Sequence, residues 1–149
     1  MLFRSQLVDA GLPGRNIVQI GINDFANSKF YSDRANELGI SVIHRRNFDS
    51  SSIGEIASRA RATLSHCKVI YLDIDVDVCD RSAVPAAPAA MPGGISADQL
   101  RQLVSNLAQE KRVTTFDITE IDATIDTPDQ RTTRLAALLI LEIAAAKAK

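Results

Sequence analysis

The stretch Val69-Ile70-Tyr71-Leu72-Asp73-Ile74-Asp75 is the strongest fold signal in this 149-residue chain. It is an apolar, partly β-branched run into which aspartates enter only near the end. Such a run is typical of a strand that is buried on both faces of a parallel sheet. The stretch therefore predicts a central strand whose last residues carry carboxylates.

Three further β-rich runs alternate with helical stretches along the chain. The runs span residues 17–22, 40–44 and 113–118. Helices are expected at residues 29–38 and 51–65, from Ser96 onward, and from about Asp129 to the C-terminus. This alternation implies a parallel sheet with right-handed crossovers. The sequence thus predicts one α/β domain over residues 1–149, in three α/β/α layers, with about four strands and four helices.

Local signals mark the starts of two of these helices. Ser96 and Gln99 lie three residues apart, as in a capping box, and apolar residues follow them at helical spacing. Asn27 and Ser28 are both candidates for the cap of the helix at residues 29–38.

Composition excludes several classes of protein. Hydrophobic residues make up 46% and charged residues 23% of the chain, which is a globular balance. The net charge of −1 predicts no attraction to nucleic acid or to an anionic membrane surface, and basic pairs such as Arg45-Arg46 are interpreted as solvated charges. No apolar stretch approaches the roughly 20 residues that a membrane span needs, and Met1–Arg4 do not resemble a signal peptide. Cys67 and Cys79 form no disulfide framework, so we expect two reduced thiols in a cytoplasmic protein.

Acidic residues gather where two of the predicted strands end. Asp73, Asp75 and Asp77 alternate, so they point to one side if the strand remains extended. Asp117 and Glu120 lie at the equivalent end of the fourth strand. Ligands of open α/β sheets sit at this edge, and clustered carboxylates are costly to desolvate unless a positive charge compensates them. The pattern fits a site for hard cations such as Mg²⁺, Mn²⁺ or Ca²⁺, and it also fits a solvated strand end.

The residues that follow carry a specific resemblance. Asp75-Val76-Asp77-Val78-Cys79-Asp80 is followed by Pro85 and then by Gly93-Gly94, just before the helix at Ser96. This order resembles the core of the arginase, agmatinase and formimidoylglutamase (ureohydrolase) family, which reads Asp-x-Asp-x-x-Asp, a proline-containing loop, Gly-Gly and a helix.

Three other segments extend the resemblance over nearly the whole chain. Phe116-Asp117-Ile118-Thr119-Glu120 is similar to the family's later Asp-x-x-Glu element. Arg131-Thr132-Thr133 is similar to the start of its terminal helix. Phe25-Ala26-Asn27-Ser28 is most similar to the formimidoylglutamase branch. The resemblance implies an arginase-like fold, of which this chain is the C-terminal portion.

The resemblance also implies roles for individual residues. Asp75 is expected to bridge two Mn²⁺ ions, and Asp77 to bind one of them. Glu120 is expected to face the cationic end of an amidine or guanidine substrate. Asp80 and Asp117 are expected to support the site by holding its loops. His44 and His66 match no ligand of the family and are interpreted as structural.

The implied reaction is hydrolysis of a linear C–N bond, most like that of a formimidoylglutamase in histidine breakdown, in which N-formimino-L-glutamate and water give glutamate and formamide. Specificity for arginine or agmatine, in place of N-formimino-L-glutamate, is the alternative within the family. The Gly-Gly-Asp-His and Asp-Ala-His-x-Asp elements of the family, which supply histidine ligands, do not occur in this sequence. A non-catalytic metal- or partner-binding fragment therefore remains an alternative. The incomplete sheet leaves an exposed edge, so we expect a homo-oligomer.

Overall fold

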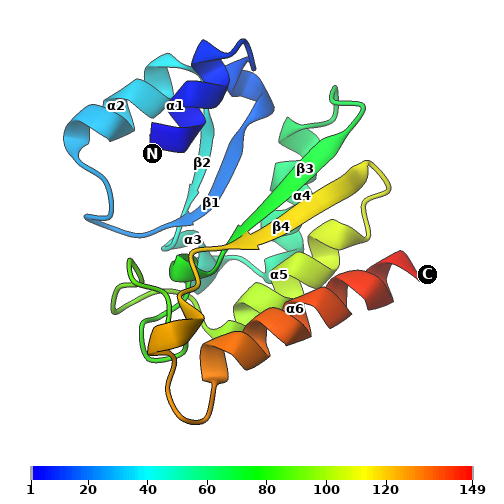
Figure 1. Cartoon of the computed structure of the whole chain (residues 1–149). Helices are drawn as coiled ribbons and strands as arrows, with labels where there is room; N and C mark the ends of the chain where they lie inside the picture. Colours follow the sequence, from blue (N-terminus) through cyan, green and yellow to red (C-terminus); the bar gives the residue numbers. More distant parts are fainter. Residues whose placement is uncertain (1, 149) are drawn as a thin grey trace.

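A computed structural model describes residues 2–148, with side chains described from residue 6 onward, and shows strands and helices alternating along the chain (Figure 1). The strands are β1 (Val18–Ile22), β2 (Ser41–His44), β3 (Ile70–Asp75) and β4 (Val113–Thr119). The α-helices are α1 (Leu2–Asp9), α2 (Lys29–Glu37), α3 (Asn47–Ser50), α4 (Ile53–Thr63), α5 (Ala97–Ala108) and α6 (Arg131–Lys147). Short 3₁₀ turns, η1 (Gly14–Asn16), η2 (Val76–Val78) and η3 (Ala123–Ile125), lie between them.

The four strands form two parallel pairs. β1 pairs with β2, and β3 pairs with β4, whereas no ladder joins β1 to β3 in the described part of the chain. The predicted parallel arrangement is thus present as two pairs of strands, and every observed pairing is parallel. β1 and β3 do not pair with each other because a cleft, which both strands line, separates their facing edges.

Helices flank the strands on two sides. In Figure 1, α1 and α2 lie beside β1 and β2, whereas α4, α5 and α6 lie on the other side of the strands. Most of the hydrophobic core lies on the side of α4, α5 and α6. It is built from residues such as Ile56, Ala60, Ile74, Leu103 and Leu139, all of which are buried. The α/β class and the layered arrangement thus follow the prediction.

Hydrogen-bonded caps begin three of the helices. The Ser96 side chain accepts from the Gln99 backbone N–H while the Gln99 side chain accepts from the Ser96 N–H, which confirms the predicted capping box. Ser52 and Glu55 form a second box at the start of α4. Ser28, rather than Asn27, caps α2.

Two helices were missing from the prediction. Neither α1 nor the four-residue α3 was expected, and α3 buries only Phe48. The predicted helix at residues 51–65 is shorter than expected, because Ser52 caps it and it ends at Thr63. Among the described helices, none is both long enough and apolar enough to cross a bilayer.

The two cysteines have different surroundings. Both are free thiols; Cys79 is fully buried, whereas Cys67 is half-buried. Burial raises the pKa of the Cys79 thiol to about 12, so this side chain is a small apolar core group rather than a nucleophile.

An ion pair joins the loops at the amino ends of β3 and β4. The Arg112 guanidinium donates to both carboxylate oxygens of Glu110 and to the main-chain oxygens of Leu64 and Cys67. Hydrogen bonds from Arg112 lower the pKa of Glu110 to about 2. The Glu110 carboxylate thus holds Arg112 in position to bridge the end of α4 to the start of β4.

The ion pair of Glu110 and Arg112 predicts that the protein loses stability in acid. The folded-state pKa of Glu110 lies below its usual 4.5, so the stabilisation is complete above pH 4.5 and is lost as the pH falls towards about 2. We expect the free energy of unfolding, measured by urea titration, to fall less steeply over this range in Glu110→Gln than in the unchanged protein. Equal slopes in the two proteins would contradict the assignment.

Candidate metal centre

The carboxyl end of β3 places Asp75 at the start of a tight turn. β3 ends at Asp75 and passes directly into η2, and the Asp77 backbone N–H donates to Asp75 Oδ1 at 3.2 Å. The strand therefore does not stay extended as far as Asp77, and the expected alternation holds only for Asp73 and Asp75. The cause is local, since the Asp75 carboxylate caps the turn and the fully buried Val76 anchors it in the core.

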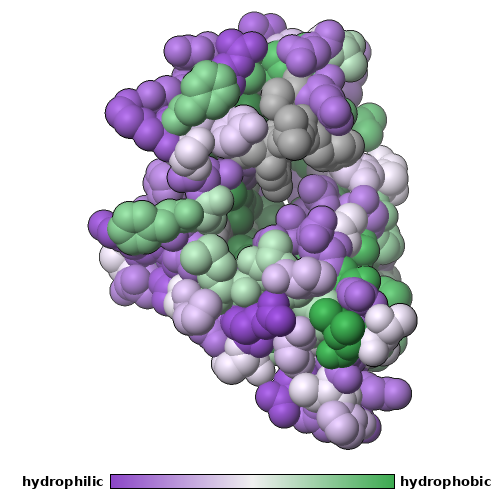
Figure 2. All heavy atoms as spheres, turned by 60° about the vertical axis from the view of Figure 1, so that its left-hand side comes forward, coloured by the Kyte–Doolittle hydropathy of each residue, from purple (hydrophilic) through white to green (hydrophobic). Residues whose placement is uncertain are grey.

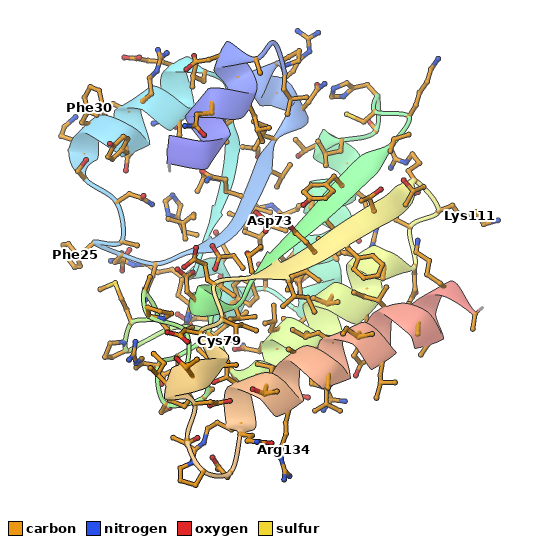
Figure 3. All side chains as sticks on the ribbon, viewed as in Figure 1. Phe25, Phe30, Asp73, Cys79, Lys111 and Arg134 are labelled. Atoms are coloured by element: carbon orange, nitrogen blue, oxygen red, sulfur yellow. The ribbon has the colours of Figure 1, made fainter. Side chains whose placement is uncertain are left out.

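Asp73 and Asp117 interact with neighbours across the β3–β4 pair. Asp73 lies opposite Asp117 in the register, and it accepts a hydrogen bond from Thr119 Oγ1 at 3.2 Å. Tyr71 Oη donates to Asp117 Oδ2 at 2.5 Å, and this bond raises the pKa of Tyr71 to about 12. Figure 3 shows Asp73 projecting from β3 towards the side on which β1 lies. The structure thus places Asp117 in a contact between strands; its supporting role in a metal site stays a prediction.

Asp80 closes the loop that follows the turn. Its Oδ1 accepts from the backbone N–H and the hydroxyl of Ser82, and its Oδ2 accepts from the Gly93 N–H at 2.8 Å. These bonds hold the pKa of Asp80 below its ordinary value, with the Ser82 hydroxyl as the largest cause. One carboxylate therefore joins the two ends of the loop at residues 81–92.

A buried threonine attaches the same loop to the last helix. Thr132 is fully buried, and its Oγ1 accepts from the Ala86 N–H at 3.1 Å. Asp126 in turn accepts from the backbone N–H groups of Thr132 and Thr133 at the start of α6. The resemblance had singled out this threonine-rich segment without a role, and the structure gives it one: it anchors the loop to α6.

Glu120 directly follows β4 at the same edge of the fold. Asp75 lies opposite Thr119 in the register, so Glu120 is one residue beyond the level of Asp75. Its side chain is exposed, and its φ of 62° lies in the left-handed region. A residue with a Cβ adopts that region at a cost of about 1–2 kcal/mol. The backbone therefore turns sharply at the residue that the sequence assigned to substrate binding.

Residues near the carboxyl ends of β1 and β2 contact the end of the loop that follows β3. Arg45 Nε donates to the Gly93 oxygen at 3.0 Å, and Asn23 Nδ2 lies 3.5 Å from the Pro92 oxygen. Gly21 adopts φ +87°, and a Cβ at this position would come within 2.4 Å of Val78 Cγ2. The interpretation of Arg45 as a solvated charge was wrong. No periodicity could reveal its partner, because Gly93 lies 48 residues away in the sequence.

The candidate metal centre has the right kind of donor atom for a metal ion but few such donors. Asp75 and Asp77 offer carboxylate oxygens, which suit hard divalent cations. Within residues 2–148, however, no three His, Cys, Asp or Glu side chains are grouped so as to hold a metal ion. His66 instead bonds Asn16 through Nε2 at 2.8 Å, and His44 is exposed on β2. The described residues therefore fit part of a metal centre rather than a complete one.

Gly94 allows the turn and the loop to pack closely. A Cβ at this position would lie 2.3–2.6 Å from the main chain of Cys79 and Asp80, which cannot move aside cheaply. We expect Gly94→Ala to destabilise the protein by about 1–3 kcal/mol in urea unfolding, as overpacking does.

Gly54→Ala is the matched control. Gly54 lies in α4, where the nearest atom to an added Cβ is Ser52 Oγ at 4.0 Å. This change is expected to be neutral or to stabilise the protein by about 0.4–1 kcal/mol. A Gly94→Ala protein as stable as Gly54→Ala would show that the loop is not held against the turn.

Comparison with known proteins gives the fold and the site a family context. Residues 1–146 match the arginase family. The chain is 37% identical over 140 residues to the formimidoylglutamase of Halalkalibacterium halodurans, covering 93% of this chain and 44% of that protein. It is 32% identical over 141 residues to the formimidoylglutamase of Bacillus subtilis, again covering 93% and 44% of the two chains. The chain thus spans less than half the length of these curated relatives.

Solved structures agree with the sequence match. The crystal structure of formimidoylglutamase from Bacillus subtilis superposes with a TM-score of 0.90 at 28% identity, over 97% of this chain and 45% of that one. An arginase from Bacillus cereus superposes with a TM-score of 0.80 at 24% identity, over 87% and 44% of the two chains, a likeness of fold alone. The predicted arginase-like fold is therefore confirmed, and the chain belongs to the arginase family.

Proposed function

We propose that this chain forms part of a manganese-dependent hydrolase that converts N-formimino-L-glutamate and water into glutamate and formamide. The observation that carries the proposal is the 37% identity, over 93% of the chain, to a protein named formimidoylglutamase. The position of Asp75 and Asp77 at the carboxyl end of β3 supports it, because ligands of α/β sheets gather at that edge.

The two aspartates are proposed as ligands. Asp75 and Asp77 would hold the Mn²⁺ ions, together with ligands from a part of the fold outside this chain. A bound metal pair lowers the pKa of a water molecule and holds it beside the substrate carbon. The hydrogen bond from the Asp77 N–H to Asp75 Oδ1 orients the Asp75 carboxylate at the start of the turn.

Glu120 is proposed to bind the substrate. A carboxylate at the end of β4 holds the cationic formimino group by charge-assisted hydrogen bonds, and the left-handed backbone at this residue sets the direction of the side chain. In the reaction, the water oxygen adds to the formimino carbon. The bond from that carbon to the glutamate nitrogen then breaks, and this nitrogen takes a proton.

A non-catalytic metal- or partner-binding fragment is the second candidate. It is favoured by the lack of any three-residue metal group within residues 2–148. In that case the chain by itself binds a cation weakly and hydrolyses nothing. Specificity for arginine or agmatine in place of formimino-glutamate is the variant of the first candidate.

The proposal also includes the oligomeric state and the location of the protein, which is a homo-oligomer in the cytoplasm. The exposed side chains of Leu138, Ile140 and Leu141 on α6 support self-association, because apolar side chains gathered on one helix are a common form of interface. The net charge of −1 supports a small-molecule substrate rather than nucleic acid.

The function can be tested in a chimera. The chain replaces the matching portion of Bacillus subtilis formimidoylglutamase, and glutamate release from N-formimino-L-glutamate is measured with Mn²⁺ present. We expect hydrolysis that falls by roughly 100-fold or more in Asp75→Asn and Asp77→Asn, since loss of a ligand should cost at least as much as loss of an outer partner. Glu120→Gln is expected to raise KM more than it lowers kcat.

Asp33→Asn is the control for loss of a carboxylate. Asp33 pairs with Lys29 on the exposed surface of α2, so its replacement should leave kcat and KM unchanged. A folded chimera that is inactive on formimino-glutamate would contradict the proposed function. Preference for arginine or agmatine would establish the variant specificity instead.

A further inference from the structure

The backbone bend at Glu120 needs support from its neighbours. Its φ of 62° lies in the left-handed region, which a residue with a Cβ keeps only where the surrounding structure holds it. The Glu120 side chain is exposed, so its own packing does not supply that support. The bend is therefore held by the residues on either side of it.

On the strand side, the bend is held by the pairing of β4 with β3. Thr119 is the last residue of β4 and lies opposite Asp75 in the parallel register. The Thr119 hydroxyl also donates to Asp73 Oδ1 at 3.2 Å. These contacts fix the residue before Glu120, and the residues after it are fixed by another segment.

Beyond the bend, the chain is held by the loop at residues 81–92. Ile121 packs against the hydrophobic core, and the Asp122 backbone N–H donates to the Ala86 oxygen at 2.9 Å. Ala86 belongs to this loop and is fully buried. The direction in which the chain leaves Glu120 therefore depends on the position of Ala86.

Ala86 is held in turn by Thr132 on α6. The Ala86 N–H donates to Thr132 Oγ1 at 3.1 Å, and both residues are fully buried. A buried N–H that loses its acceptor keeps the cost of its desolvation, so this bond strongly constrains Ala86. The N–H and the C=O of Ala86 thus connect Thr132 to the chain just beyond Glu120.

Asp126 fixes the first turn of α6, on which Thr132 lies. Partial burial raises the pKa of Asp126, but hydrogen bonds from three threonines outweigh it and bring the pKa down to about 2. These bonds come from the backbone and side chain of Thr133, the Thr127 N–H and the Thr132 side chain. The carboxylate is therefore ionised at neutral pH, and it holds the turn that positions Thr132.

The loop that contains Ala86 also forms part of the wall beside the candidate metal centre. Ala89 and Met91 line the same cleft as Asp75 and Asp77. Figure 2 shows a hollow with hydrophobic side chains inside it. A shift of the loop therefore changes the wall of the cleft as well as the bend at Glu120.

We propose that Thr132 is a positioning residue for Glu120. Its hydroxyl holds Ala86, and Ala86 sets the direction of the bend from which the Glu120 carboxylate projects. The consequence for catalysis rests on the proposed function, in which Glu120 binds the cationic group of the substrate. Thr132 is buried between α6 and the loop, so it acts through Ala86 and touches no substrate.

Two substitutions separate the hydroxyl of Thr132 from its shape. Thr132→Val keeps the branched side chain and removes the acceptor of the Ala86 N–H. Thr132→Ser keeps the hydroxyl and loses only the methyl group. Thr133→Val is the matched control, because the Thr133 hydroxyl lies in the same turn of α6 but bonds Asp126 rather than Ala86.

Amide hydrogen exchange of the chain tests the positioning without an assay of activity. In Thr132→Val, the protection factors of the Ala86 and Asp122 amides should both fall by about fivefold or more, because a buried hydrogen bond is lost. Thr132→Ser and Thr133→Val should leave both amides as protected as in the unchanged chain. Loss of protection at Ala86 alone, with Asp122 unaffected, would overturn the proposal.

The unchanged chain decides the outcome if Thr132→Val does not fold. Two amides held by one set of contacts open together, so the protection factors of Ala86 and Asp122 should agree within about threefold. An Asp122 amide that exchanges as fast as an unstructured peptide would overturn the proposal.

Steady-state kinetics of the chimera with Bacillus subtilis formimidoylglutamase measure the consequence for binding. We expect Thr132→Val to raise KM for N-formimino-L-glutamate by about fivefold or more and to change kcat by less than about twofold, because a displaced Glu120 weakens binding of the cation. Thr132→Ser and Thr133→Val should keep both constants.

The kinetic result separates positioning from a role in stability alone. A folded Thr132→Val chimera with an unchanged KM would overturn the proposal, and so would a loss confined to kcat. An unchanged chimera that hydrolyses nothing would count against the proposed function. The exchange of the Ala86 and Asp122 amides would then decide the positioning by itself.

Discussion

The parallel register of β3 with β4 is the constraint on which the candidate centre depends. It sets Asp75 opposite Thr119. The turn that contains Asp77 and the sharp bend of the backbone at Glu120 therefore both follow directly after this pair of residues. Side chains within the pair reinforce it, since Tyr71 bonds Asp117 and Thr119 bonds Asp73. Neither strand alone could bring these acidic groups to one edge of the fold.

The loop beyond β3 depends on the same alignment but is fixed by different means. The Asp80 carboxylate closes the loop on itself, Gly94 lets it pack against the turn, and Thr132 attaches it to α6. These three residues are far apart in sequence and hold one segment of about a dozen residues without regular structure.

Local signals were sufficient to predict the elements that bear the site. The β-branched runs marked the four strands to within two residues, and the pair Ser96 and Gln99 marked the start of α5, because both patterns arise from interactions within a few residues. The turn at Asp75 was not predictable from alternation, since it depends on a carboxylate accepting from the chain two residues later. The contact of Arg45 with Gly93 and the separation of the strand pairs depend on packing between distant segments, which no short window contains.

The roles of Asp75 and Asp77 rested on resemblance, and the structure adds the geometry that the resemblance lacked. Both side chains line the carboxyl end of the cleft between β1 and β3. A small donor set and the unpaired edges of β1 and β3 thus lie next to each other in the described part of the chain.

Anomalous diffraction at the manganese edge, from crystals of the chimera grown with Mn²⁺, tests the central claim most directly. The account predicts two anomalous peaks at the carboxyl end of β3, with Asp75 within bonding distance of both and Asp77 within bonding distance of one. Peaks elsewhere, or manganese bound without either aspartate, would contradict it.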